Sequence, residues 1–238
     1  MCVSPQVDVV AGLAISVVAV DAIRHCSSPR LVGLALIPAI FAVHSFTSAL
    51  VWLGLLGDVS ARALDAATAF YLVIAFVVLP IYAPVSILLI ESQGWRRPVL
   101  VLLAGAGAYA AVEFLFGLTS GRGSATACSY YIDFNISGVS TYSAVLYVVA
   151  TCGAFLLSGQ RILVLWGAVN ALAVGLLGIW AGNGLPSLWC LWAACTSFFI
   201  AWYLRSLARD REAGTPWPWE QAPEHRWTGS RIGRRLQE

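Results

Sequence analysis

Seven apolar stretches alternate with short polar segments along the chain, and each is about as long as a helix that crosses a membrane. Because lipid offers no hydrogen bonds to an exposed backbone, each stretch is expected to form an α-helix. The pattern predicts an all-α bundle of seven transmembrane helices in residues 1–207 and a polar cytoplasmic tail in residues 208–238. The predicted spans are Val7–Ile23, Leu31–Leu56, Ala66–Ile90, Val99–Leu118, Val139–Leu157, Ile162–Ala181 and Leu185–Leu207.

Two local features modify this pattern. The third stretch contains Pro80 and Pro84, which predict a kink because proline lacks the N–H that a helix needs. The longest loop on the predicted outer side, Thr119–Gly138, is long enough to fold back over the outer end of the bundle.

Composition supports the bilayer as the solvent. The chain is 59% hydrophobic and 11% charged, with a mean hydropathy of +0.79, whereas a water-soluble domain carries about a quarter charged residues. This excludes a disordered chain. The net charge of +2 is too small to indicate a nucleic-acid partner.

The arginines predict the orientation, because cytoplasmic loops are enriched in basic residues. With the N-terminus outside, only Arg62 and Arg122 fall outside. We therefore expect a multi-pass plasma-membrane protein with its C-terminus in the cytoplasm. The arginines that then fall inside are Arg24, Arg30, Arg96, Arg97, Arg161, Arg205, Arg209, Arg211 and the four after residue 225.

The basic residues are all arginine, so Schiff-base chemistry on lysine is excluded. The cysteines lack metal-finger spacing, and we expect no metal or cofactor. Cys2 and Cys128 both fall on the oxidising outer side, where either a disulfide or two free thiols is compatible with the sequence.

Ionisable residues inside predicted spans are the most informative, because they are costly in lipid. Asp8, Asp21 and Glu91 lie near span ends, where ion pairs with nearby arginines explain them. His44 and Glu113 lie deeper, at similar depth in the outer half of the second and fourth spans. A buried carboxyl without an arginine nearby is protonated or hydrogen-bonded, either to His44 or a serine as a structural contact, or in a functional site.

Aromatic residues lie at a similar depth. Tyr109 and Phe116 share a helix face with Glu113, and Ser48 and Trp52 share one with His44. An aromatic belt at the membrane interface accounts for part of the set. The same residues also describe an aromatic-walled chamber with one carboxyl. The further aromatic residues at this depth are Tyr71, Trp180 and Trp189.

Such a chamber favours a membrane-bound cyclase that protonates a lipophilic, prenylated substrate. A neutral acid starts the reaction, aromatic faces stabilise the carbocation, and water is excluded. We expect Glu113 to be the acid, with His44 and Ser48 positioning it. Asp21 and Glu91 are reserve acids if the site opens on the inner leaflet. The expected chamber lining is Trp52, Tyr71, Tyr109, Phe116, Trp180 and Trp189.

Three alternatives stay open. The first alternative is a non-enzymatic membrane subunit or carrier of a small lipophilic ligand, in which the polar residues form structural contacts. An outward-facing metal or redox site is the second alternative, with His44, Glu113, Asp8 and Cys2 as ligands. Proton or ion conduction is the third, with a sparse polar path through Asn170 and Asp21.

Several motifs resemble an uncharacterised bacterial family of small seven-helix membrane proteins. The motifs include Met1-Cys2-Val3-Ser4, His44 followed by Val51–Leu55, Leu79-Pro80, Leu88–Glu91, Thr151–Ser158 and Ser187–Cys190. The family pattern has a Gln and a Glu after the histidine, where this chain has Ser45 and Ser48.

A looser resemblance, in size, topology and chemistry, is to the membrane-bound cyclases of meroterpenoid and indole-terpenoid pathways. It implies that acidic residues start a cyclisation.

Overall fold

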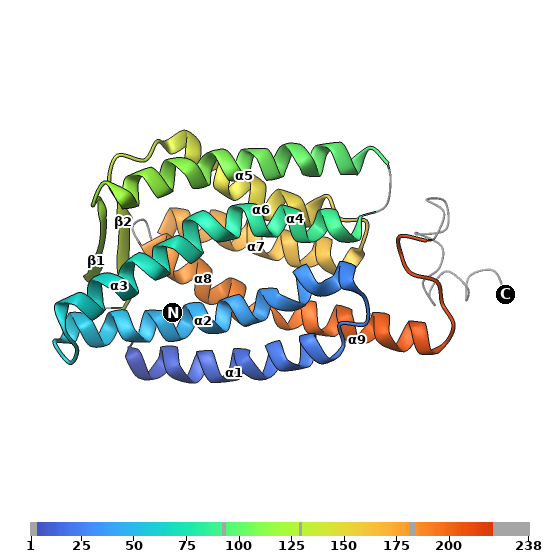
Figure 1. Ribbon diagram of the computed structural model, residues 1–238, viewed down its shortest axis with the longest axis horizontal. Helices are drawn as coiled ribbons and strands as arrows, with labels where there is room; N and C mark the ends of the chain where they lie inside the picture. The colour runs from blue at the N-terminus through green and yellow to red at the C-terminus, as the bar shows by residue number, and fades with distance from the viewer. Residues whose placement is uncertain (1–3, 92–93, 129, 181–183, 221–238) are drawn as a thin grey trace.

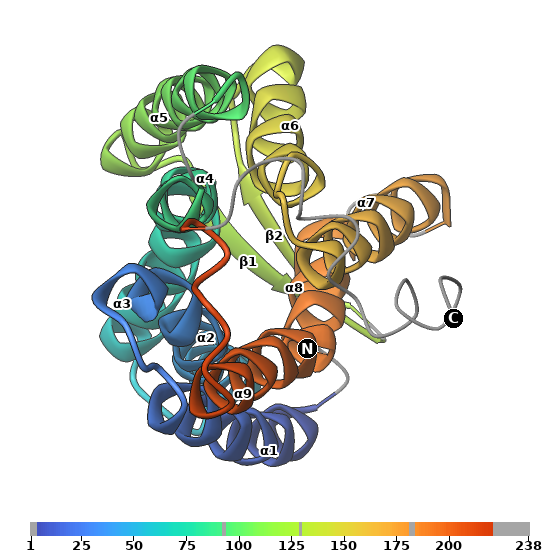
Figure 2. The ribbon, with the colours of Figure 1, turned by 90° about the vertical axis from the view of Figure 1, so that its right-hand side faces the viewer.

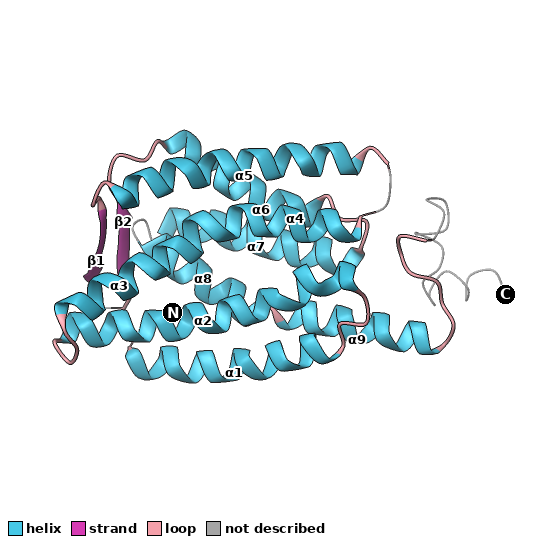
Figure 3. Cartoon of the chain, viewed as in Figure 1, coloured by secondary structure: helices cyan, strands magenta, loops and turns pink. Residues whose placement is uncertain are grey.

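The computed structural model describes residues 4–91, 94–128, 130–180 and 184–220. They form a bundle of roughly parallel and antiparallel helices with a short hairpin at one end (Figure 1, Figure 3). The helices are α1 (Pro5–Arg24), α2 (Val32–Leu56), α3 (Ala61–Leu72), α4 (Leu79–Ile90), α5 (Arg96–Thr119), α6 (Thr141–Leu156), α7 (Arg161–Trp180), α8 (Leu185–Thr196) and α9 (Phe198–Glu212). A 3₁₀ turn, η1 (Pro29–Leu31), precedes α2.

Six helical segments are long and apolar enough to cross a membrane, which indicates a membrane protein. Two of them combine neighbouring elements: α3 continues through η2 (Val73–Val78) into α4, and α8 continues into α9. The fifth predicted span is the exception, because α6 has 16 residues and a length of about 24 Å against a hydrocarbon core of about 30 Å. The predicted helical character is thus confirmed, and the length and composition of the helices support six of the seven predicted spans.

Serines start several of these helices. The side chains of Ser4, Ser60 and Ser140 accept hydrogen bonds from the backbone N–H groups three residues later, at the starts of α1, α3 and α6. An N-cap serine satisfies a donor that the first helical turn leaves unpaired. The short polar segments between the apolar stretches therefore carry the signals that begin the helices.

Where the sequence predicts a kink, the helix contains a π-helical segment, η2 (Val73–Val78), which ends two residues before Pro80. Pro80 has no N–H for the carbonyl of Phe76, and its ring crowds that carbonyl. The wider π turn relieves this conflict within a continuous helix.

Arginines gather at one end of the bundle. In Figure 1 the C-terminal ends of α1 and α9 and the N-terminal ends of α5 and α7 lie together at the right. These are the ends that carry Arg24, Arg96, Arg161 and Arg209. The opposite end carries the hairpin.

The hairpin is the part of the fold that the all-α prediction omitted. Strands β1 (Gly123–Ala127) and β2 (Ile132–Ile136) pair antiparallel, with Ala125 opposite Phe134. Ile132, Phe134 and Ile136 alternate along β2 and are buried. The loop therefore packs an apolar strand face against the end of the bundle.

Helices differ in how far they are enclosed. Viewed end-on, α1 and α5 lie at the periphery of the bundle (Figure 2). In the most apolar parts of α1, α5 and α7, 28% of the residues are buried. In the segment that contains α2, 67% are buried. The core is therefore built around α2.

Candidate ligand-binding site

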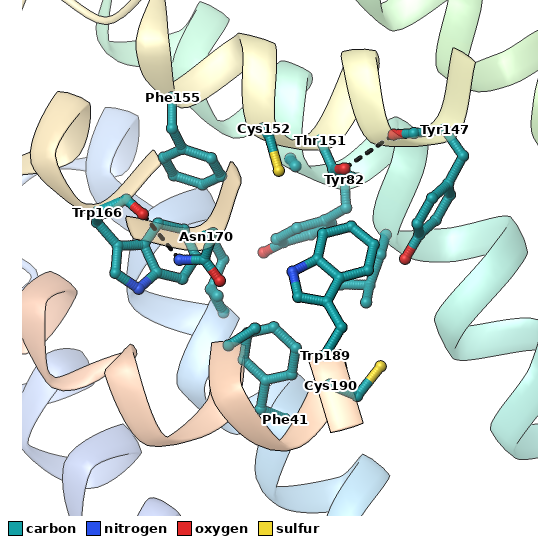
Figure 4. A pocket seen from close by; sticks show the side chains of 14 residues that line it. Phe41, Tyr82, Tyr147, Thr151, Cys152, Phe155, Trp166, Asn170, Trp189 and Cys190 are labelled. Atoms are coloured by element: carbon teal, nitrogen blue, oxygen red, sulfur yellow. Dashed lines mark hydrogen bonds between the residues drawn. The ribbon is translucent and has the colours of Figure 1, made fainter. Parts of the chain in front are cut away.

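A cavity of about 50 Å³ lies among five helices in the middle of the bundle (Figure 4). Its walls are aromatic and aliphatic, and neither Asp nor Glu is among its lining residues. The lining comes from α2 (Ile37, Phe41), α4 (Leu79, Tyr82, Ala83), α6 (Tyr147, Thr151, Cys152, Phe155), α7 (Trp166, Asn170) and α8 (Trp189, Cys190, Ala193).

Aromatic pairs hold the walls in place. Phe155 meets Trp166 edge to face, with ring centroids 4.4 Å apart, and Tyr147 meets Trp189 at 5.3 Å and 89°. Edge-to-face pairs are favourable because the positive edge of one ring meets the negative face of the other. The two pairs tie α6 to α7 and to α8.

A larger hollow of about 820 Å³, here called the vestibule, lies between this cavity and the hairpin end. Its lining includes Phe76, Phe114 and Phe134, and it is open to the surroundings at the exposed residues Asn135 and Thr141. The vestibule and the cavity share the lining residues Tyr147, Trp189 and Cys190. The Tyr147–Trp189 pair therefore stands at the boundary between the two spaces.

Helix α6 lines both spaces with one face. Ala144, Tyr147 and Val148 line the vestibule, and Thr151 and Phe155 line the cavity. These positions recur every three or four residues, so they form one stripe along the helix. Through this stripe, α6 forms a continuous wall from the opening of the vestibule to the centre of the bundle.

Several polar groups of the cavity form hydrogen bonds with neighbouring protein groups. The Thr151 hydroxyl donates to the Tyr147 carbonyl at 2.8 Å, and Trp166 Nε1 donates to Thr196 Oγ1 at 2.9 Å. Asn170 Nδ2 donates to the Trp166 carbonyl at 2.8 Å. Among the described residues that line the cavity, Asn170 Oδ1, Trp189 Nε1 and the Tyr82 hydroxyl are buried without a hydrogen-bond partner.

Glu113 lies outside the cavity, and its role corrects the sequence prediction of a neutral acid in an aromatic chamber. Its carboxylate accepts hydrogen bonds from the Ser140 N–H at 2.7 Å, from the Ser140 hydroxyl at 3.0 Å and from the Ser143 hydroxyl. These donors sit at the N-terminus of α6, where the helix dipole also favours a negative charge. Glu113 therefore joins α5 to the start of α6. Of the structural contacts considered from sequence, the serine partner is the one observed.

Three predicted chamber residues face outward. Trp180 is 84% exposed, Phe116 64% and Tyr109 57%. In a membrane protein, aromatic residues on the lipid side have the same spacing and composition as residues on the core side. The helical pattern grouped these residues correctly on faces but assigned those faces the wrong direction.

His44, Ser48, Trp52 and Tyr71 are buried, yet none of them lines the cavity or the vestibule. The His44 ring stacks on Tyr71 at 3.8 Å, and Tyr71 stacks on Phe134 at 3.7 Å. This column joins α2, α3 and β2. Both ring nitrogens of His44 lack a hydrogen-bond partner within the described part of the chain.

The two reserve acids form interhelical contacts. Asp21 binds Arg205 through two hydrogen bonds of 2.6 and 2.7 Å, which ties α1 to α9. Glu91 accepts a hydrogen bond from the Gly159 N–H at 3.0 Å and lies 3.7 Å from Arg96. Both sit at the arginine-rich end, and their partners Arg205 and Gly159 are remote in sequence, whereas Arg96 follows Glu91 by five residues.

Trp189 is the one predicted site residue that lines the cavity. Sequence reasoning assigned no site role to Tyr82, Tyr147 or Trp166, and it named Asn170 only for the conduction alternative. One signal was available, because Asn170 is the single carboxamide inside a predicted span. The others look like ordinary apolar span residues until the helices are packed.

Among the described residues, no group of three or more His, Cys, Asp or Glu side chains is arranged to hold a metal ion. Cys2, which belongs both to the expected outer metal site and to the expected Cys2–Cys128 disulfide, lies outside the described residues.

Fold and site together define a helical membrane protein with an uncharged aromatic cavity at its centre. The chain belongs to a family of unknown function, DUF6629, whose family model matches residues 1–214. Neither the comparison with curated proteins nor the comparison with solved structures gives a match. The resemblance to terpene cyclases is thus not supported by any of these comparisons.

Proposed function

We propose that this protein is a multi-pass plasma-membrane protein that binds a small lipophilic molecule in the central cavity. The observation that carries the proposal is an aromatic cavity, lined by residues of five helices, whose lining residues include no carboxylate. Ligand sites are typically concave and mostly apolar, with a few placed polar groups.

Size constrains how a ligand is held. A volume of about 50 Å³ has room for only a few water-sized groups, so it takes one end of a molecule. The rest of the molecule extends past Tyr147 and Trp189 into the vestibule. With the arginine-rich end in the cytoplasm, the vestibule faces the outer side of the membrane, as the N-terminus-outside prediction requires.

Filling the cavity tests the proposal. Ala193 on α8 lines the cavity and is 7% exposed. The Ala193→Leu variant is expected to lower ligand affinity at least tenfold, because the added carbons occupy the space that the ligand needs. The matched control is Ala69→Leu, which adds the same atoms on the exposed side of α3.

Binding is measured by dialysing a tritiated lipophilic probe between nanodiscs that contain the protein and empty nanodiscs. The excess of probe on the protein side reports specific binding and corrects for partitioning into the bilayer. Equal excess for wild type and Ala193→Leu, or no excess for any probe, contradicts the proposal.

A cyclase is the second candidate, and one observation favours it. Ser140 lines the aromatic vestibule and hydrogen-bonds Glu113, so a carboxylate stands one residue behind a wall that contains Phe76, Phe114 and Phe134. Glu113→Gln is expected to abolish product formation from a prenylated substrate if this candidate holds. Full product formation by the folded variant eliminates it.

A further inference from the structure

Two buried polar atoms of opposite character face the central cavity. Asn170 is 5% exposed and Trp189 is 8% exposed. Within the described chain, Asn170 Oδ1 and Trp189 Nε1 each lack a hydrogen-bond partner. Figure 4 shows both atoms, together with the Tyr82 hydroxyl, turned toward the same space between α4, α7 and α8.

A buried polar group without a partner is costly, so such groups in a folded protein usually meet water or a ligand. The Tyr82 hydroxyl beside this pair also lacks a partner, whereas other polar groups of the site are bonded. Trp166, the other tryptophan of the cavity, has its N–H bonded to Thr196, and the Thr151 hydroxyl is bonded to backbone. The unsatisfied donor and acceptor are therefore confined to one part of the lining.

We propose that the ligand is a neutral lipophilic alcohol whose hydroxyl group binds between Asn170 and Trp189. A hydroxyl both accepts and donates, so its oxygen takes the Trp189 N–H while its own O–H bonds Asn170 Oδ1. A ketone or an ether accepts but cannot donate, so it offers no hydrogen bond to Asn170 Oδ1. A carboxylate or phosphate is excluded, because neither Arg nor Lys lines the cavity to balance the buried charge.

The geometry also orients the alcohol. Its hydroxyl lies at the inner end, in the small cavity, and its hydrocarbon chain passes the Tyr147–Trp189 boundary into the vestibule. Aromatic side chains along this path, including Phe76 and Phe114, suit a chain that contains double bonds. This inference rests on the proposed lipophilic-ligand function and specifies its substrate class.

The experiment compares three tritiated probes of one carbon skeleton in the nanodisc dialysis: geraniol, geranyl methyl ether and the hydrocarbon 2,6-dimethyl-2,6-octadiene. Wild type is expected to bind geraniol about tenfold more tightly than the hydrocarbon, corresponding to about one net hydrogen bond. The ether accepts but cannot donate, and it falls between them.

Matched variants separate the hydrogen bond from the shape of the site. Trp189→Phe removes an unpaired N–H and is expected to abolish most of the alcohol preference, with hydrocarbon affinity changed less than twofold. Trp166→Phe is the control, because it shortens a tryptophan of the same cavity whose N–H already bonds Thr196. Asn170→Leu is expected to remove the difference between alcohol and ether.

The outcomes distinguish the two levels of the proposal. If the hydrocarbon and the alcohol bind equally well to wild type, the alcohol assignment is wrong and lipophilic binding stands. Equal losses of alcohol preference in Trp189→Phe and Trp166→Phe also overturn the assignment. If none of the three probes shows an excess, the proposed function itself fails.

Discussion

The region around α1 and α2 and the region between α4 and α8 bury polar groups in opposite ways. The first region contains ionisable side chains, with Asp8 beside Ser48 and His44 stacked on Tyr71, but His44 and Asp8 line neither the cavity nor the vestibule. The second region contains the space, and its polar atoms belong to an amide, an indole and hydroxyls. In this molecule the buried carboxyl and imidazole groups of the first region and the space for a ligand therefore lie apart.

The same contrast separates Glu113 from Trp189. Glu113 is the residue that the sequence favours most as a catalytic acid. In the structure it accepts three hydrogen bonds at the start of α6. From sequence, Trp189 fits an aromatic belt at the membrane interface as well as it fits a chamber wall. In the structure it stands where the cavity meets the vestibule. Four variants test how far this division holds.

The largest effect is expected from Gly107→Ala, which disturbs the packing behind the cavity. A Cβ at Gly107 would lie 1.9 Å from the Pro80 carbonyl oxygen, and backbone on both sides prevents an easy adjustment. Separating α4 from α5 should lower the free energy of unfolding by about 3 kcal/mol, measured by titration with SDS. Gly105→Ala is the control on the same helix, since no atom lies within 4 Å of the added carbon. Equal stability of the two variants would contradict the close contact.

Glu113→Ala is expected to have the next largest effect. It removes the acceptor of three hydrogen bonds and leaves the Ser140 N–H at the N-terminus of α6 without that partner. The variant should lower the Tm more than Ser143→Ala, which removes one of the three donors. An unchanged Tm combined with lost turnover would instead favour the catalytic role that was expected from sequence.

His44→Phe tests whether the first region takes part in binding. Phenylalanine keeps the stacking on Tyr71 and removes two buried nitrogens without partners, so stability should stay within about 1 kcal/mol of wild type. His44→Ala loses the stacking as well and should cost about 2 kcal/mol or more. Probe binding should be the same in wild type and His44→Phe, and a loss of binding would break the division between the two regions.

The smallest effect is expected from Asp21→Asn at the arginine-rich end. The pair with Arg205 lies where the arginine is 55% exposed, and exposed ion pairs contribute little. The Tm should change less than in any variant above, and the change should disappear at high salt. A loss of probe binding in Asp21→Asn would restore its role as a reserve acid.

Much of the helical framework is predictable from sequence because it depends on local properties. Apolar length defines the spans, and serines cap the starts of several helices. The alternating strand Ile132–Ile136 was overlooked because a predicted loop of polar and small residues conceals its three inward-facing side chains.

The candidate site was harder to predict, since the relevant quantity is the direction in which each helix face points. On α5, the face with Tyr109 and Phe116 points outward, while Gly107 and Phe114 point into the protein. Both faces are apolar, because lipid and protein core make the same demand on composition.

The sequence by itself therefore determined a membrane-embedded helical chain with its arginines at one end, because backbone hydrogen bonding and charge act locally and do not depend on the packing partner. Only the tertiary structure decided that Glu113 meets Ser140 and Ser143, and that Asn170 and Trp189 face an open space. Empty volume is a property of several helices together, and no single helix carries a pattern that records it.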